Sequence, residues 1–218
     1  MAADFNTILP SGVLPDAVSI SSEVPTVKAR TISGRTSVRQ FGGQKFTFKV
    51  SLPALTHAEW QPISAFLNSK RNGYVSFTIS FPFANRVQTS SVKSPDDGTQ
   101  FTSGSHAIGT RSGISLTMNT TQGDSSARAL RTGDFIRFSN HTKVYQITSG
   151  NETFSNSSTT KTITIEPGLV TALSSTTCVS DGGNREVYFT VRQASEVMTY
   201  ETDIENMFRF EFDVEEVI

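Results

Sequence analysis

The sequence predicts a mainly β protein: a β-sandwich or barrel with one packed α-helix, interrupted by an inserted small β-barrel or sandwich domain. Ser and Thr account for 57 of the 218 residues and Phe outnumbers Trp 16 to 1, a composition that suits strands better than helices. Apolar residues recur at every second position in several segments, which is the period of a half-buried strand. Only one segment carries apolar residues at helical spacing.

Residues 35–85 contain most of the regular periodicity. Apolar and polar residues alternate over 46–52, which predicts a half-buried strand. The run at 37–41 is separated from this strand by Gly42 and Gly43, and two such runs across a Gly-Gly pair predict a β-hairpin.

The predicted helix covers residues 57–71. Thr56 is followed three residues later by Glu59, the pattern of a capping box that satisfies two of the free amides at a helix start. Asn72 and Gly73 follow the apolar stripe and are residue types that tolerate a left-handed C-cap. The stripe consists of Trp60, Ile63, Phe66 and Leu67.

Three further strands are predicted around the same domain. Residues 74–81 alternate, and Pro82 ends that strand or confines it to a sheet edge. Residues 187–191 form a short strand, and residues 208–214 form another with charged residues on its opposite face.

The segment between residues 101 and 184 predicts four or five short strands typical of a small barrel or sandwich. Residues 151–160 read as a polar loop between two of them. The expected strands cover 114–118, 133–138, 143–147, 162–165 and 177–179.

Composition shifts twice along the chain and predicts a discontinuous organisation. Residues 1–93 and 185–218 form the scaffold domain, and residues 94–184, rich in Ser, Thr and Gly, form the inserted domain. Turn signals at 94–98 and 181–184 would serve as the two hinges. Residues 1–34 are expected to be extended because Pro10, Pro15 and Pro25 prevent a long helix.

The sequence does not indicate an enzyme, and we predict no catalytic residue, no cofactor and no metal. The lone Cys178 excludes an intramolecular disulfide and a multi-cysteine metal site. The histidines, His57, His106 and His141, do not have metal-ligand spacing. No Gly-x-Ser-x-Gly elbow, Walker phosphate loop or Gly-x-Gly-x-x-Gly motif is present. The start of the chain lacks the features of a secretion signal and no apolar run is long enough for a membrane helix, so we expect synthesis in a cytoplasm and no membrane insertion.

The formal charge of −1 arises from a basic front half and an acidic back half. The two charged sets predict complementary subunit interfaces, and a split of this kind suits head-to-tail ring assembly. The basic set is Lys28, Arg30, Arg35 and Arg39. The acidic set is Glu201, Asp203, Glu205, Glu211 and Asp213.

The order of these elements resembles that of bacteriophage tail structural proteins, and most closely a distal tail or baseplate-hub protein with an inserted β domain. In the scaffold the resemblance is carried by Ser33-Gly34-Arg35, Phe46-x-Phe48, Leu55-Thr56-x-x-Glu59-Trp60-x-x-Ile63-x-x-Phe66-Leu67, Gly73-x-x-x-Phe77 and Phe81-Pro82. In the insertion it is carried by Ile114-Ser115-Leu116, Leu130-x-x-Gly133-Asp134-Phe135-Ile136, Lys143-Val144-Tyr145-x-Ile147 and Ile163-x-Ile165-x-Pro167-Gly168-Leu169.

The resemblance implies a non-enzymatic virion protein that forms a ring, six copies in that family, at the distal end of the tail tube. Other tail and baseplate proteins would be its partners, and DNA would pass through the channel only as cargo. Two alternatives stay open. One is a tail-tube or tail-terminator protein, and the other is a carbohydrate-binding module in host attachment, whose aromatic platform would come from Phe101, Phe135, Phe138, Tyr145 and Phe154.

Overall fold

The computed structural model describes most of the chain as two compact units, one formed by Met1–Ile79 with Thr190–Ile218 and the other by Ser80–Phe189. The elements are mainly strands with a single α-helix among the described residues, which confirms the predicted fold class. The predicted domain boundaries near 94 and 184 fall outside the described residues and stay predictions. The structure describes residues 4–9, 13–40, 43–71, 73–81, 101–103, 114–120, 128–149, 151–154, 160–173, 187–195, 197, 199–202 and 207–218.

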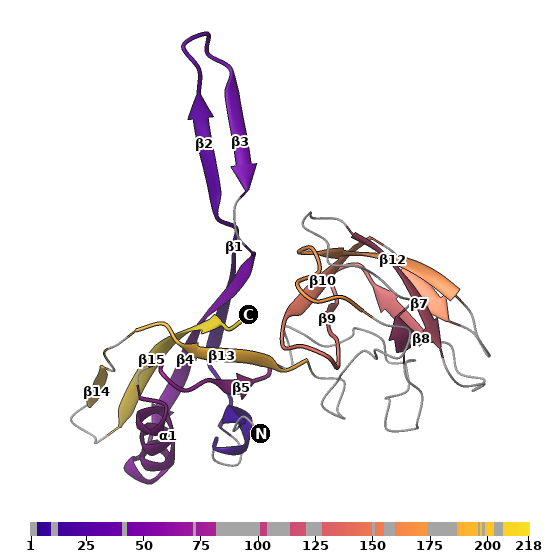
Figure 1. The fold of residues 1–218 in the computed structure, drawn as a ribbon. Coiled ribbons are helices and arrows are strands. Elements are labelled where there is room, and N and C mark those ends of the chain that lie inside the picture. Colours follow the sequence, from indigo (N-terminus) through magenta and orange to yellow (C-terminus); the bar gives the residue numbers. More distant parts are fainter. Residues whose placement is uncertain are drawn as a thin grey trace. The chain divides into compact units, whose positions relative to one another are not determined.

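The first unit is built on one six-stranded sheet (Figure 1). Its path runs β1-β4-β15-β13-β5, and β14 pairs with the start of β15 beside this path. The strands are β1 (Ala17–Glu23), β4 (Lys45–Leu55), β5 (Phe77–Ile79), β13 (Phe189–Gln193), β14 (Tyr200–Thr202) and β15 (Phe208–Glu216). The predicted strands around 46–52, 187–191 and 208–214 are therefore present, whereas only Phe77–Ile79 of the run 74–81 is a strand.

Alternation in the two central strands gives the sheet one buried face and one open face. In β4 the buried positions include Phe46, Phe48 and Val50, and in β15 they include Phe210 and Phe212. The residues between them are polar or charged and point to the other face, as the period of two predicts.

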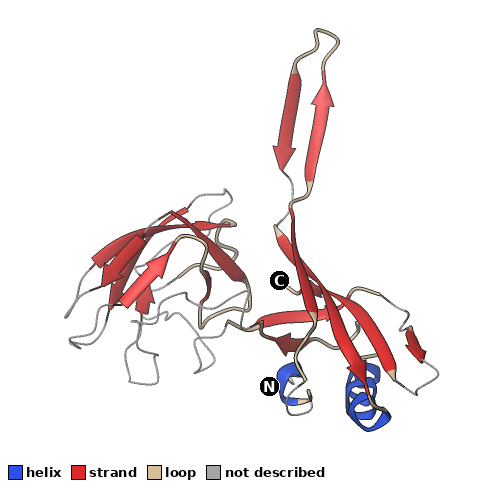
Figure 2. Ribbon diagram, turned by 180° about the vertical axis from the view of Figure 1, so that it is seen from behind, coloured by secondary structure: helices blue, strands red, loops and turns tan. Residues whose placement is uncertain are grey.

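Helix α1 (His57–Ser69) covers the buried face. The carboxylate of Glu59 accepts hydrogen bonds from the backbone N–H of Thr56 at 2.8 Å and from its hydroxyl at 2.7 Å, as the predicted capping box requires. The helix ends two residues before the predicted limit, because Lys70 is already the C-cap and Arg71 has left-handed backbone at φ 51°. Figure 2 shows the helix as the longer blue element.

The N-terminal segment supplies a core residue that the sequence did not reveal. Residues Phe5–Thr7 form a single 3-10 turn, η1, and the Phe5 ring is fully buried. Its centroid lies 5.3 Å from that of Phe212, 5.8 Å from Phe66 and 6.1 Å from Phe77. Phe5 therefore joins the helix, the edge strand β5 and the sheet in one aromatic core.

The predicted hairpin across Gly42 and Gly43 is wrong. Strand β3 (Thr36–Gln40) pairs with β2 (Thr26–Arg30), and β4 pairs with β1 and β15. The turn that reverses the chain lies instead at residues 31–35, where Gly34 has φ 81° and the N–H of Thr31 bonds to the carbonyl of Arg35 at 2.9 Å. Glycine adopts a positive φ without a steric cost because it has no Cβ atom.

The second unit contains a five-stranded sheet of order β6-β7-β12-β10-β9 and a separate pair of strands, β8 and β11. The strands are β6 (Phe101–Ser103), β7 (Ile114–Thr120), β8 (Arg128–Arg131), β9 (Phe135–Arg137), β10 (Val144–Ser149), β11 (Asn151–Phe154) and β12 (Thr160–Glu166). The prediction of a loop throughout 151–160 is wrong for its first four residues, because β11 pairs with β8. The strand expected at 177–179 and the hinges at 94–98 and 181–184 lie outside the described residues.

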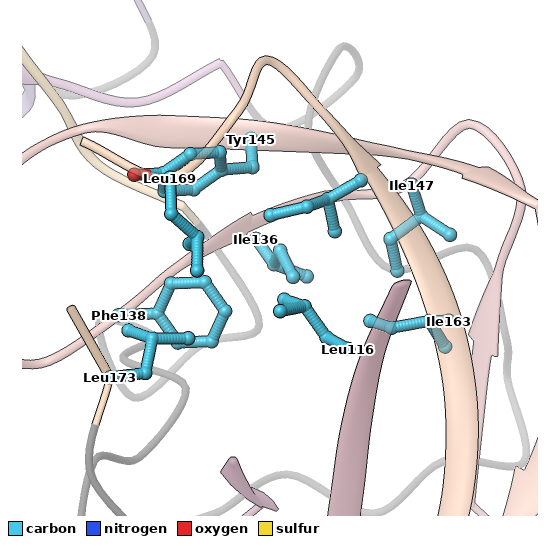
Figure 3. Packing of buried hydrophobic residues seen from close by; sticks show 9 residues of the cluster. Leu116, Ile136, Phe138, Tyr145, Ile147, Ile163, Leu169 and Leu173 are labelled. Carbon is cyan, nitrogen blue, oxygen red and sulfur yellow. The ribbon is translucent and has the colours of Figure 1, made fainter. Parts of the chain in front are cut away.

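This unit has its own hydrophobic core, which Figure 3 shows from close by. Strands β7, β9, β10 and β12 contribute aliphatic side chains, and the segment after β12 closes the cluster with two leucines. Its members are Leu116, Ile136, Phe138, Tyr145, Ile147, Ile163, Ile165, Leu169 and Leu173.

Candidate subunit interface

All four residues of the predicted basic set lie in one structural feature, the ribbon formed by β2, β3 and the turn between them, which we call the arm (residues 26–40). The arm continues the ribbon of β1 and β4 beyond the sheet (Figure 1). Every residue from 26 to 40 is exposed. A two-stranded ribbon is marginally stable alone in water, so an arm of this length gains stability from whatever covers it.

The register of the arm distributes its side chains over two faces. Residues directly opposite in an antiparallel pair share a face, so Lys28 lies with Val38, and Val27 lies with Arg39. Val27 is 52% exposed and Val38 is 57% exposed. Each face thus carries one exposed valine beside at least one cation.

The charge of the arm is uncompensated in the described structure. Residues 24–44 contain four cations and no Asp, Glu or His. Within the described residues, ion pairs form between strands of the sheet and involve none of the four arm cations. The arm is therefore a basic projection that suits an acidic partner.

The acidic set is located on the other part of the same unit. Glu211 and Asp213 lie on the open face of β15, and Glu201 lies on β14 with its side chain exposed. Asp203 and Glu205 lie outside the described residues. The structure therefore brings three of the five predicted acidic residues onto one sheet and leaves two unplaced.

Part of this acidic charge is neutralised within the chain. Lys49 on β4 forms an ion pair with Glu211, which raises the pKa of Lys49 through the hydrogen bond and charge of that carboxylate. Glu215 accepts a hydrogen bond from Nε of Arg192 at 2.6 Å and lies 3.7 Å from Nζ of Lys45. These partners were not predicted from the sequence, because Lys45 and Lys49 of β4 face the carboxylates only when β4 is paired with β15.

A groove opens beside the acidic residues at one end of the sheet. Its volume is about 700 Å³ and it lies along the ends of β4 and β14 and the start of β15. Three carboxylates and one guanidinium line it, together with short apolar side chains of β4. The lining includes Asp16, Pro53, Ala54, Glu201, Arg209 and Glu211.

The second unit holds a polar cluster around His141. Nδ1 of His141 lies 2.6 Å from Oδ1 of Asn140, and Nε2 lies 2.8 Å from the hydroxyl of Tyr145. The same hydroxyl accepts the N–H of Val170 at 3.2 Å. These contacts fit a neutral imidazole that donates through Nδ1 and accepts through Nε2.

Burial lowers the pKa of His141 to about 4, and the nearby guanidinium of Arg137 contributes to the shift. The cluster connects the hairpin of β9 and β10 to the segment that follows β12. Its arrangement is therefore structural, because each polar atom of His141 is used in holding neighbouring backbone and side chains.

The remaining histidines and the lone cysteine form no site in the described residues. His57 lies on α1 and its Nε2 is 2.9 Å from Nε2 of Gln61, whereas His106 and Cys178 lie outside the described residues. Among the described residues no three His, Cys, Asp or Glu side chains gather as metal ligands. In that same part of the chain, no helix is long and apolar enough to cross a membrane.

The aromatic residues considered for sugar binding are mostly unavailable. Phe135, Phe138 and Tyr145 are buried in the second unit. The side chains of Phe101 and Phe154 are outside what the structure describes. Sugar platforms use exposed rings, so the three buried aromatics belong to the core.

Residues 99–179 match the family model described as the B domain of the distal tail protein pb9. The matched range lies within the second compact unit. No curated protein matches the chain. The match supports the resemblance to phage distal tail proteins, while the baseplate-hub detail stays a prediction.

Proposed function

Because residues 99–179 match the family model of a phage distal tail domain, we propose that the chain is a non-enzymatic subunit of a ring at the distal end of the tail tube. The observation that carries the proposal is the family match of residues 99–179, which assigns a tail structural role. The ring goes beyond that match and is supported by the architecture of the first unit. The six copies and the adaptor position come from the resemblance to distal tail proteins.

The architecture supports repeated subunit contacts. The first unit offers a projecting arm with uncompensated positive charge and an exposed acidic patch on a different part of its surface. Two unlike surfaces on one chain generate a head-to-tail contact, and such contacts close into a ring when the rotation between neighbours permits it.

The same architecture fits the partners expected of a tail protein. Other tail and baseplate proteins would contact the two ends of the ring, and DNA would pass through the channel as cargo. The open face of the sheet carries carboxylates of β15 balanced by β4 lysines, a surface without the clustered cations that hold phosphate groups.

Between the two remaining alternatives, the family match favours the distal position over a tail-tube or tail-terminator role. The buried positions of Phe135, Phe138 and Tyr145 disfavour a carbohydrate-binding module. We therefore take the ring protein as the function to test.

The test is the native mass of the purified full-length chain, measured by light scattering across a wide concentration range and combined with negative-stain imaging. A chain of 23.7 kDa predicts 6 × 23.7, or about 142 kDa, for a closed ring of six. Ring-shaped particles of one size are the expected result. A chain that stays monomeric at all concentrations, alone and with purified tail tube, would contradict the proposal.

A further inference from the structure

The arm and the acidic groove are the two halves of one contact, and we infer that the arm tip of one copy docks in the groove of the next copy. The tip is residues 30–35, and the groove is the one lined by Asp16, Pro53, Ala54, Glu201 and Glu211. This inference rests on the proposed ring and names the contact that would build it.

The tip presents an exposed apolar side chain between two cations on a hydrogen-bonded turn. Ile32 is completely exposed, and no described residue covers its side chain. Arg30 and Arg35 flank it in sequence, so an apolar side chain lies between two cations. The hydroxyl of Thr31 accepts the N–H of Arg35 at 3.1 Å and donates to the carbonyl of the same residue, which fixes the shape of the turn before it meets a partner.

The groove has the complementary chemistry. Pro53 and Ala54 give it an apolar wall, and its lining includes the carboxylates of Asp16, Glu201 and Glu211 and the single guanidinium of Arg209. Glu211 is already paired with Lys49, so Asp16 and Glu201 supply the charge that is available to a partner. Within the described residues, the carboxylates of Asp16 and Glu201 form no ion pair. The volume of about 700 Å³ is large enough for the isoleucine and the two flanking cations.

The two surfaces lie at opposite ends of the sheet, which is why the occupant is a second copy. Strand β1 begins beside the groove, where the N–H of Asp16 bonds to the carbonyl of Ser51, and it ends at Glu23, where the arm begins. Its seven residues separate the two by about 20 Å, and Ile32 lies roughly 30 Å farther along the extended ribbon. The tip of a chain therefore cannot reach its own groove, and occupancy by a neighbour produces a directional, head-to-tail chain of subunits.

The first test is site-directed cross-linking of the full chain. In a Cys178→Ser background, the double variant Ile32→Cys with Ala54→Cys is treated with a short bismaleimide under assembly conditions. A ladder of covalent oligomers on a denaturing gel is expected. The matched control is Ile32→Cys with Tyr74→Cys, which places the second thiol at an exposed residue away from the groove and should give monomer.

The second test is a charge-reversal cycle. Arg35→Glu and Glu201→Arg should each raise the concentration needed for assembly by tenfold or more, because each leaves like charges facing across the contact. The combined variant should recover most of the loss. Assembly of Arg35→Glu at the wild-type concentration would overturn the inference.

The outcomes separate this inference from the ring itself. Rings that form without the ladder and without sensitivity to Arg35→Glu would overturn the arm contact while leaving the proposed function intact. A chain that never assembles would overturn both. A ladder in the Tyr74→Cys control equal to that of Ala54→Cys would also count against the groove as the specific acceptor.

Discussion

The ribbon that runs from β1 through the arm to β4 has two halves that differ in the burial of their side chains. At its base, β4 buries alternate side chains against α1 and the aromatic core, whereas the arm exposes every residue on both faces. The difference follows from the register. The phenylalanines of β4 share one face, but Val27 and Val38 of the arm lie on opposite faces and build no common apolar surface. A strand pairing alone does not make a core, because the core needs apolar residues gathered on one side.

The largest expected difference between the two halves is in stability. Phe48→Ala should lower the free energy of unfolding of the first unit by about 3–5 kcal/mol, since the ring is almost completely buried and leaves a cavity. Val38→Ala, a smaller truncation at an exposed position of the arm, should alter it by less than about 0.5 kcal/mol under monomeric conditions.

Fluorescence of Trp60 during denaturant unfolding is the measurement, because this single tryptophan packs on Phe210 at 4.7 Å and Phe208 at 5.9 Å within the first unit. Equal decreases in the free energy of unfolding for the two variants would contradict the exposed position of the arm.

Acid should destabilise the second unit and leave the arm unchanged, and this difference is smaller than the one between the two substitutions. The folded pKa of His141 is about 4, below its ordinary value near 6.5, so the unfolded chain takes up a proton at higher pH than the folded unit. The stability that depends on neutral His141 is complete above pH 6.5 and is lost as pH falls toward 4. Because the ring is partly exposed, we expect a loss of about 1 kcal/mol after allowance for solvent screening.

Urea titrations followed by the methyl NMR signals of Ile147, a neighbour of Tyr145 in the same core cluster, measure this loss. The variant His141→Gln should show a flatter dependence over the same pH range. The arm, which contains no Asp, Glu or His, should show no change in its own signals between pH 6.5 and 4. A pH response in wild type that persists in the variant would contradict the assignment to His141.

The elements that the sequence predicted correctly are those specified by local pattern. The capping box of Thr56 and Glu59 and the stripe that begins at Trp60 lie within a few residues of one another, and α1 follows from them. Strand β15 was also predicted from local pattern, because its apolar and charged residues alternate and the buried positions follow that alternation.

The features that the sequence did not reveal depend on contacts between distant residues. The partner of β3 is decided by the turn at Gly34 and by the pairing of β1 with β4, and the Gly-Gly pair near residue 42 gave a competing local signal. Phe5 belongs to the core because distant aromatic residues lie against it, and Phe212, the nearest of them, is more than two hundred residues along the chain.

The candidate interface stays a prediction, and the structure shows where its charged residues lie. The basic set lies together on the arm, but Lys49 pairs with Glu211 across the β4–β15 ladder, so the acidic surface is smaller than the sequence count suggests. Charge totals along a chain do not show which charges already have partners in the fold. The groove beside Asp16 and Glu201, where carboxylates remain unpaired among the described residues, became visible only with the sheet assembled.

The most direct test of the central claim is amide hydrogen exchange of the arm in the full-length protein, measured for the dilute monomer and for the assembled form. We expect fast exchange of residues 26–40 in the monomer and at least tenfold slower exchange after assembly, while β4 amides are protected in both states. Arm amides that are already protected in the monomer, or that stay unprotected in the assembled ring, would contradict an arm that is free in the monomer and covered by a neighbouring copy.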